Sequence, residues 1–274
     1  MQHILNLIRG GLIGSAELVP GISGGTVALI VGIYERALHN ANKLVKGKIK
    51  EVDWVFIATV AVGMVAAVFG LSTILSSFVA NNFSISHALF FGMVLVSISV
   101  PISMISKAER TKPLCWISGA IGAVAIFILT GLTSNAVEDP NLVVVFFAAA
   151  VAVCALILPG MSGSLILLML GLYQPIIQAV SDRDLAVIAV FIVGAICGLV
   201  AFVRILNYLL DVHRGVTLAV MTGFMVGSLR ALWPWGEGQD ASTAPIIGMI
   251  VLGAAIVAAF IYADRRIAKQ KQAA

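Results

Sequence analysis

Two stretches of this sequence interrupt an apolar run with a proline–glycine turn: "VPGISGGTVALIVGIY" at 19–34 and "LPGMSGSLILLMLGLY" at 158–173. Proline lacks an N–H group and clashes with the preceding turn of a helix, while glycine adopts backbone conformations that other residues avoid. Each stretch therefore predicts that one helix ends and that a second helix begins after a short break.

The rest of the chain has the composition of a membrane protein. Of its 274 residues, 60% are hydrophobic and only 11% are charged. Apolar segments near the roughly 20 residues that cross a bilayer as a helix recur throughout. Segments such as 54–80 and 185–210 are apolar on nearly every face, whereas helices of a soluble domain carry a polar face. We therefore expect one all-α integral membrane domain over residues 1–274.

The two quoted stretches match as copies of one motif. Shifting the chain by 139 positions superposes several residues of the first stretch on identical residues of the second. The superposed pairs include Pro20 and Pro159, Gly21 and Gly160, Ser23 and Ser162, Gly24 and Gly163, Gly32 and Gly171, and Tyr34 and Tyr173. Because the shift is about half the chain length, we expect a duplication with halves 1–135 and 136–274.

Each half continues with the same series of segments. Three long apolar segments follow each motif, at 54–80, 85–106 and 113–133, and then at 185–210, 215–235 and 244–263. An odd number of spans turns the second half upside down relative to the first. The sequence therefore predicts an inverted repeat, in which each half is a broken re-entrant helical hairpin plus three transmembrane helices.

Charges in the loops agree with this inversion, because lysine and arginine are enriched in short cytoplasmic loops. Basic residues gather at 36–50, at 107–112, after 210 and in the C-terminal tail. Loops without a basic excess lie at 80–84, 138–140, 181–184 and 236–240. The two sets alternate only if the broken pair 4–36 enters from the cytoplasm and returns there, while the pair 141–180 enters from outside and returns outside. We therefore expect both termini to be cytoplasmic in a bacterial inner membrane. We read the net charge of +4 as a topology signal and not as a nucleic-acid surface.

The depth of the broken pairs, 4–36 and 141–180, follows from their length. An arm of roughly 15 residues rises about 22 Å as a helix, which is short of the ~30 Å hydrocarbon core. Neither turn carries the charges expected of a loop that reaches water. We favour re-entrant hairpins, and two full spans per pair are the alternative.

The turns offer an anion site. A break inside the membrane frees backbone N–H groups, which must be buried in protein or face a watery cavity. Helices that begin near Gly24 and Gly163 would direct these donors and the positive ends of their dipoles at such a cavity. The candidate binding residues are Ser23, Gly24, Gly25, Thr26, Ser162, Gly163 and Ser164, with Pro20, Gly21, Pro159 and Gly160 shaping the turns. The alternative is that the turns only let helices pack closely.

Charged residues inside apolar segments are costly and are usually retained for function. Glu17 precedes the first turn, and its equivalent in the second half is Leu156. It suits a site that couples transport to a proton or sodium ion, or a structural pair with Arg9 or Arg230. Arg230 and Arg9 are candidate phosphate ligands, although Arg230 could instead extend to the membrane surface. For Arg204 we favour that surface position.

Enzyme signals are weak. The letters "GISGG" at 21–25 match the G-x-S-x-G motif of serine hydrolases, but that motif needs a preceding strand and a nearby His/Asp pair. The chain shows no metal-ligand cluster and no nucleotide-binding loop, so we expect no enzyme activity, no metal and no cofactor. The glycine pairs Gly10/Gly14, Gly194/Gly198 and Gly223/Gly227 predict close helix packing instead.

Three stretches resemble the bacterial polyprenyl-phosphate translocase family: "GSAELVPGISGGTVALIVGIYERAL" at 14–38, "LPGMSGSLILLMLGLY" at 158–173 and "GFMVGSLRALWPW" at 223–235. The resemblance covers essentially the whole chain. It implies a carrier that returns undecaprenyl phosphate from the outer to the cytoplasmic leaflet for reuse in cell-envelope synthesis. The family's signature falls on the residues of the two turns named above, on Glu17, and on Gly227, Ser228, Arg230 and Pro234.

The leading hypothesis is thus a lipid-phosphate transporter, whose partners are the polyprenyl phosphate, the surrounding lipids and a coupling H⁺ or Na⁺. An ion-coupled transporter of a small anion is the first alternative. A membrane enzyme that acts on lipid phosphate is the second.

Overall fold

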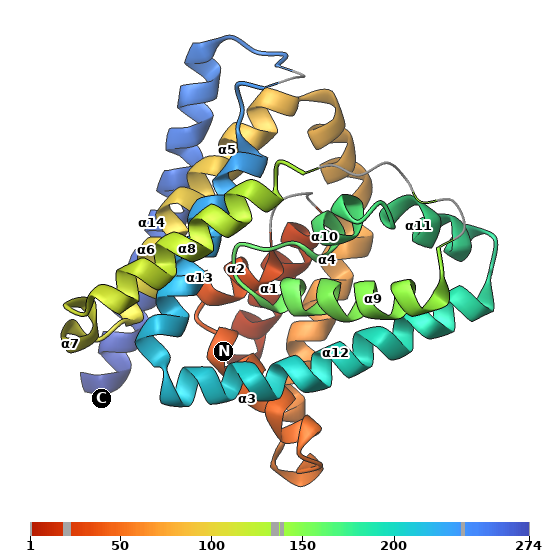
Figure 1. The fold of residues 1–274 in the computed structure, drawn as a ribbon. Coiled ribbons are helices and arrows are strands. Elements are labelled where there is room, and N and C mark those ends of the chain that lie inside the picture. The colour runs from red at the N-terminus through yellow and green to blue at the C-terminus, as the bar shows by residue number, and fades with distance from the viewer. Residues whose placement is uncertain (1, 19–22, 133–136, 138–139, 237–238, 274) are drawn as a thin grey trace.

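The computed structural model describes residues 2–18, 23–132, 137, 140–236 and 239–273. Within these ranges every regular element is a helix, as the composition predicts. Figure 1 shows the helices gathered into one body without a separate domain.

The first half of the chain forms α1 to α8. Their bounds are α1 (Gln2–Glu17), α2 (Gly24–Ile30), α3 (Tyr34–Val45), the 3₁₀ turn η1 (Ile49–Glu51), α4 (Trp54–Asn81), α5 (Phe83–Ser97), α6 (Ser99–Met104), α7 (Lys107–Arg110) and α8 (Pro113–Leu129). The second half forms the remaining helices. These are α9 (Leu142–Ile157), α10 (Gly163–Met169), α11 (Tyr173–Ser181), α12 (Leu185–Val212), α13 (Arg214–Ser228), the 3₁₀ turn η2 (Leu229–Leu232) and α14 (Thr243–Ala273).

Five helical segments of the described chain are long and apolar enough to cross a membrane. They are α4, α5 with α6, α12, α13 with η2, and the first part of α14 to Ala263. They coincide with five of the six predicted segments. The sixth, expected at 113–133, is the 17-residue α8, which ends at Leu129 and continues as a turn through Thr130 and Gly131.

Each broken pair contains a second break that the sequence analysis did not predict. After α2 and after α10 the chain turns again, at Gly32 with φ 72° and at Gly171 with φ 68°. The helices α10 and α11 are bent by 106° across this turn. What was expected to be one arm after the proline turn is therefore a seven-residue helix followed by a separate helix. Glycine permits this because it adopts positive φ without steric cost.

Glycines set the closest helix pairs, as their spacing predicts. A Cβ at Gly14 of α1 would lie 2.5 Å from the Met64 carbonyl of α4, and a Cβ at Gly198 of α12 would lie 2.5 Å from the Ala150 carbonyl of α9. At Gly227 of α13 the same atom would lie 2.5 Å from the Ala123 carbonyl of α8. At Gly10, Gly194 and Gly223, the other glycine of each pair, an added Cβ would lie closer still to the neighbouring backbone, at 2.1, 2.3 and 2.0 Å. Backbones approach so closely only where no side chain intervenes.

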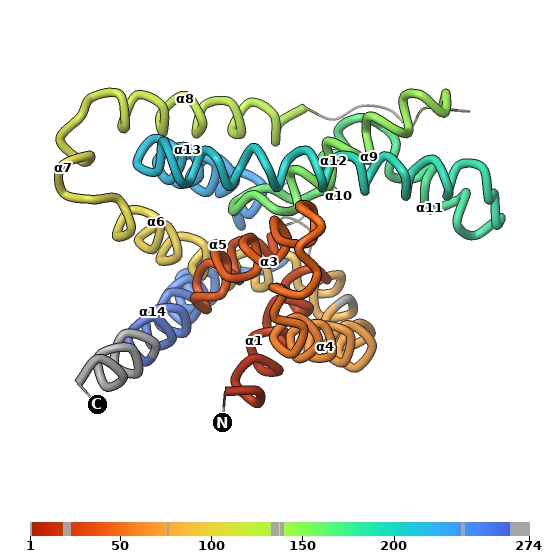
Figure 2. The backbone as a smooth tube through the Cα atoms, turned by 90° about the horizontal axis from the view of Figure 1, so that it is seen from below, coloured from red at the N-terminus to blue at the C-terminus, as the bar shows by residue number. Residues whose placement is uncertain are grey.

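The long helices pair across the two halves. In Figures 1 and 2, α5 of the first half lies along α14 of the second, and α13 of the second half lies along α8 of the first. Within each half, α1 packs on α4 and α9 packs on α12. Both α4 and α12 have 28 residues, and both α5 and α13 have 15.

Two carboxylates join the halves at equivalent positions. Asp240 accepts hydrogen bonds from the N–H groups of Phe83 and Ser84 at the start of α5, at 2.8 and 2.9 Å. Glu109 accepts one from the Gly215 N–H at the start of α13, at 3.0 Å. Glu109 and Asp240 are 131 positions apart, and so are Ser84 and Gly215. Each carboxylate thus caps a helix of the other half, in the way that acceptors at a helix start stabilise its free N–H groups.

Candidate functional site

The two proline–glycine turns meet inside the protein. The Ser23 hydroxyl donates a hydrogen bond to the Leu158 carbonyl at 3.1 Å, and the Gly160 N–H donates to the Thr26 hydroxyl at 2.8 Å. Ser23, Thr26 and the adjoining Pro159 are buried. Pro20 and Gly21 lie outside the described residues. The structure thus brings together those parts of the two turns that it describes.

The helices that start at these turns are alike. Both α2 and α10 have seven residues, and the residues before them, Ser23 and Ser162, share an extended backbone with φ −104° and −115°. Neither serine hydroxyl caps its own helix. Ser23 uses its hydroxyl to bind the opposite turn, whereas the Ser162 hydroxyl lies 2.8 Å from that of Ser164. The hydroxyls of the first turn thus join the turns, and those of the second form a local pair.

Glu17 occupies the start of α2. Its carboxylate accepts a hydrogen bond from the Gly24 N–H at 2.9 Å, across the break between α1 and α2. A Cβ at position 24 would overlap this carboxylate, so the Glu17 side chain could keep its present position only beside a glycine. An anion therefore already sits on the first free N–H of the helix, where the positive end of the helix dipole favours it. The second turn has Leu156 at the equivalent position and no such cap.

Three further glycines let backbones approach at the turns. A Cβ at Gly25 would lie 2.8 Å from the Ile157 carbonyl, and one at Gly163 would lie 2.7 Å from the Ala152 carbonyl. Gly160 has φ 83°, and its Cβ would lie 2.5 Å from the Met225 nitrogen of α13. The second turn is therefore packed directly against the backbone of α13.

Backbone donors remain at the turns. None of the hydrogen bonds found among the described residues uses the N–H groups of Gly25, Gly163 or Ser164. Ser164 is exposed, while Gly163 is buried and Gly25 is half-buried. These groups are donors available to an acceptor that enters the site.

The arginines lie elsewhere. Arg230 is exposed; its guanidinium donates to the Phe127 carbonyl at 2.8 Å and lies 4.6 Å from the centre of the Phe127 ring. Its described contacts are with the end of α8 and not with Glu17 or the turns. Arg9 is half-buried on α1, eight residues before Glu17. Arg204 is exposed and donates to the Val45 carbonyl at the end of α3, at 3.1 Å.

Among the described residues, the Ser23 hydroxyl donates to a carbonyl and not to a histidine or carboxylate base. Among the described residues there is also no group of three histidine, cysteine or acidic side chains that could hold a metal ion.

These features define the class of protein: a helical membrane protein in which two interrupted helices meet inside the body, an arrangement typical of secondary transporters. Comparison with known sequences gives the family. The sequence model of the undecaprenyl phosphate translocase-like family matches residues 13–257, and the chain belongs to this family.

Two curated relatives carry the same name. A polyprenyl-phosphate transporter of Vibrio cholerae is 33% identical over 249 residues, which are 86% of this chain and 80% of that protein. A polyprenyl-phosphate transporter of Staphylococcus aureus is 28% identical over 245 residues, which are 84% of this chain and 86% of that protein. No solved structure matches the chain.

Proposed function

We propose that this protein carries undecaprenyl phosphate from the outer to the cytoplasmic leaflet of the bacterial inner membrane, which returns the lipid for cell-envelope synthesis. The observation that carries the proposal is the meeting of the two turns, in a chain whose relatives are named for polyprenyl-phosphate transport. Such a ligand has one anionic headgroup and a long apolar tail. A wholly helical membrane body with polar groups at one internal junction suits both parts.

The fold we propose is an inverted repeat with re-entrant hairpins. Several features support it: the equal lengths of α2 and α10, the exchanged helix pairs and the equivalent caps at Glu109 and Asp240. The cap at Asp240 joins two loops expected outside, and the cap at Glu109 joins two loops expected in the cytoplasm. With 16 residues, α1 and α9 rise about 24 Å each. This is less than the hydrocarbon core of ~30 Å.

The phosphate site we propose lies where the turns meet. Its donors are the N–H groups of Gly25, Gly163 and Ser164 and the hydroxyls of Ser162 and Ser164. Phosphate oxygens accept such bonds readily, and charged acceptors form the stronger ones. Ser23 and Thr26 act differently from the sequence expectation, because their hydroxyls hold the two turns in register.

Glu17 is the residue we propose for coupling. Its carboxylate accepts from the Gly24 N–H, beside the Gly25 N–H that we propose for the phosphate, so the negative charge of a bound lipid would repel the carboxylate from this position. A displaced carboxylate takes up a proton or a sodium ion more readily than one that is hydrogen-bonded to an N–H group. Transport would then depend on the ion that Glu17 accepts.

The two arginines have supporting roles in this proposal. Arg230 follows the part of α13 that packs on Gly160, five residues after Met225. From there its guanidinium can attract a phosphate toward the second turn. Arg9, on α1, supplies positive charge on the side of Glu17.

The proposal is tested by measuring undecaprenyl phosphate on the outer surface of cells. Cells that lack the protein should accumulate the lipid on the outer leaflet, and the wild-type gene should restore the lower level. A Gly163→Val variant that inserts normally should fail to restore it, because the side chain would meet the Ala152 carbonyl. Outer-leaflet lipid that stays constant in all of these strains would contradict the proposal.

A further inference from the structure

A crevice lies between the first broken hairpin and the helices α5, α6 and α14. Its first part, the polar pocket, has a volume of about 210 Å³ and includes Tyr34, Glu35, Ser103 and Met104. Its second part, the apolar groove, has a volume of about 190 Å³ and includes Leu12, Val27 and Phe260. Ile30 lines both parts, and α14 contributes Phe260 to one and Ile261 to the other. The two parts are therefore neighbours along one crevice.

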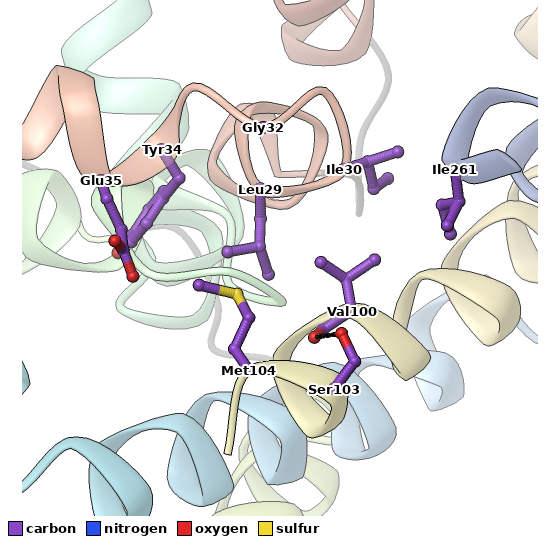
Figure 3. Close-up of a pocket in the computed structure, with 9 residues that line it drawn as sticks. All are labelled: Leu29, Ile30, Gly32, Tyr34, Glu35, Val100, Ser103, Met104 and Ile261. Carbon is purple, nitrogen blue, oxygen red and sulfur yellow. Dashed lines mark hydrogen bonds between the residues drawn. The ribbon is translucent and has the colours of Figure 1, made fainter. Parts of the chain in front are cut away.

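The polar pocket contains a buried hydroxyl without a partner. Tyr34 is only 6% exposed, and its hydroxyl makes no hydrogen bond within the described part of the chain. Figure 3 shows Tyr34 and Glu35 extending to the same side of the pocket, with Met104 and Ser103 on the facing helix α6. A buried hydroxyl left without a hydrogen-bond partner destabilises the fold. A bound molecule that completes its hydrogen bonding would account for such a group.

A cation is paired with the acidic residue of this pocket. Arg214, at the start of α13, forms an ion pair of 2.5 Å with Glu35. Both side chains are about half exposed, at 40% and 48%. Since the pair is accessible and the guanidinium presents five donors, Arg214 can turn from the carboxylate to a phosphate bound beside Glu35. Among the residues that line the pocket, Glu35 is then the opposing charge.

The apolar groove suits a hydrocarbon chain. Its lining consists of apolar side chains and Ser15, whose hydroxyl already donates to the Gly11 carbonyl of its own helix at 2.8 Å. Leu12 and Ile256, at its edge, are 40% and 47% exposed, so the groove opens toward the surrounding lipid. A tail bound here exchanges bilayer contacts for protein contacts and leaves no polar group unpaired.

We propose that this crevice holds polyprenyl phosphate in the orientation of the cytoplasmic leaflet, with the phosphate in the polar pocket and the first isoprene units in the groove. The polar pocket is lined by the start of α3, which together with η1 forms most of the basic segment 36–50, so we place this end of the protein on the cytoplasmic side. The groove runs from there along α2 toward the turn at Gly24. The crevice is thus a release station, and this inference rests on the transport function proposed above.

Equilibrium binding of undecaprenyl phosphate to the full-length protein in lipid nanodiscs tests the station. Tyr34→Phe removes only the hydroxyl and should weaken binding about tenfold, as expected for a lost hydrogen bond to a charged group. Tyr173→Phe, at the equivalent position of the second half, is the matched control and should bind like the wild type. Glu35→Gln should bind more tightly, because it removes the opposing charge and frees Arg214.

The length of the tail provides a second arm. Geranyl phosphate should bind more weakly than undecaprenyl phosphate, and Ser15→Phe, which fills the groove, should reduce that difference. Inorganic phosphate tests the headgroup alone and should bind weakest. The inference would be overturned if Tyr34→Phe bound the lipid as tightly as the wild type. It would also be overturned if Glu35→Gln lost binding, because that result would indicate a site for a cation and not for a phosphate.

Transport measured on the same preparations separates the two proposals. If the wild type binds the lipid through Tyr34 but does not move it across a bilayer, the station stands and the proposed function fails. If the wild type transports the lipid and Tyr34→Phe changes neither binding nor rate, the station fails alone.

Discussion

The hydrogen bond between the two turns gives the sharpest prediction. Thr26→Val keeps the shape of a side chain that is 2% exposed but removes the acceptor for the Gly160 N–H. That N–H is then left unpaired inside the protein, which costs about 1–3 kcal/mol. Gly160 cannot relax easily, because it has φ 83° and packs on the Met225 nitrogen. We expect Thr26→Val to lower the free energy of unfolding by about 2 kcal/mol.

A matched substitution isolates the effect. Thr222 is also buried, at 9%, and its hydroxyl donates to the Leu218 carbonyl one turn earlier in α13. Thr222→Val removes a donor from a carbonyl that already accepts a helical N–H, so its cost should stay below about 1 kcal/mol. Thr26→Ser keeps the acceptor and should recover most of the lost stability.

The assay is reversible unfolding of the purified protein in mixed micelles of detergent and SDS, followed by circular dichroism. The difference between Thr26→Val and Thr222→Val is the quantity of interest. If the two variants lose the same stability, the bond between the turns does not stabilise the junction and the reasoning about the site is refuted.

Three further predictions concern other contacts. The pKa of Glu109 is lowered mainly by the hydroxyl of Ser106, and the pKa of Asp240 mainly by the N–H of Ser84. Both carboxylates should therefore stabilise the fold at a pH above their ordinary pKa, and this stability should be lost as the pH falls through the lowered pKa. The double variant Glu109→Gln/Asp240→Asn should flatten this acid dependence of the melting temperature. Measured by the same unfolding assay in micelles, Gly223→Ala should lower the free energy of unfolding by about 1–3 kcal/mol, because its Cβ would overlap the Gly119 carbonyl. Gly248→Ala has open space around it and should raise the free energy of unfolding slightly. Glu17→Gln should leave the Gly24 hydrogen bond in place but remove the pH or sodium dependence of transport, and an unchanged dependence would show that the coupling residue lies elsewhere.

The sequence predicts the helical class and the two turns well, because both depend on local chemistry. Long apolar runs identify the spans, and proline with paired glycines marks the breaks at 20–25 and 159–163. The spacing of Gly10/Gly14 and Gly223/Gly227 also predicts close packing, because small residues one turn apart leave a flat helix face.

The second break was missed although the sequence contains its signal. Gly32 and Gly171 superpose in the repeat, each two residues before a tyrosine, and the structure shows both with positive φ. A glycine repeated at the same place in both halves indicates a backbone requirement and not only a small side chain. Tyr34 is likewise repeated, as Tyr173, but the sequence does not show its pocket, because only the fold brings α6 and α14 beside it.

Other parts of the site depend on tertiary contacts and could not be predicted. No local sequence pattern indicates that α8 packs on α13 and α14 on α5, each a helix of the other half. The same holds for the caps that Glu109 and Asp240 place on helices of the other half. Glu17 was expected to pair with an arginine or to face the site, and it caps α2 across the break. The sequence left open whether Arg230 binds phosphate or extends to the membrane surface; in the structure it is exposed and lies on Phe127, because η2 directs it toward the end of α8.

Transbilayer movement of the lipid itself tests the central claim most directly. Purified protein is reconstituted into sealed vesicles that contain undecaprenyl phosphate in both leaflets, and the fraction accessible to an external phosphatase is followed over time. With the wild type, the inner pool should become accessible, and Gly163→Val should slow this to the rate of protein-free vesicles. An inner pool that stays protected in wild-type vesicles would contradict the account.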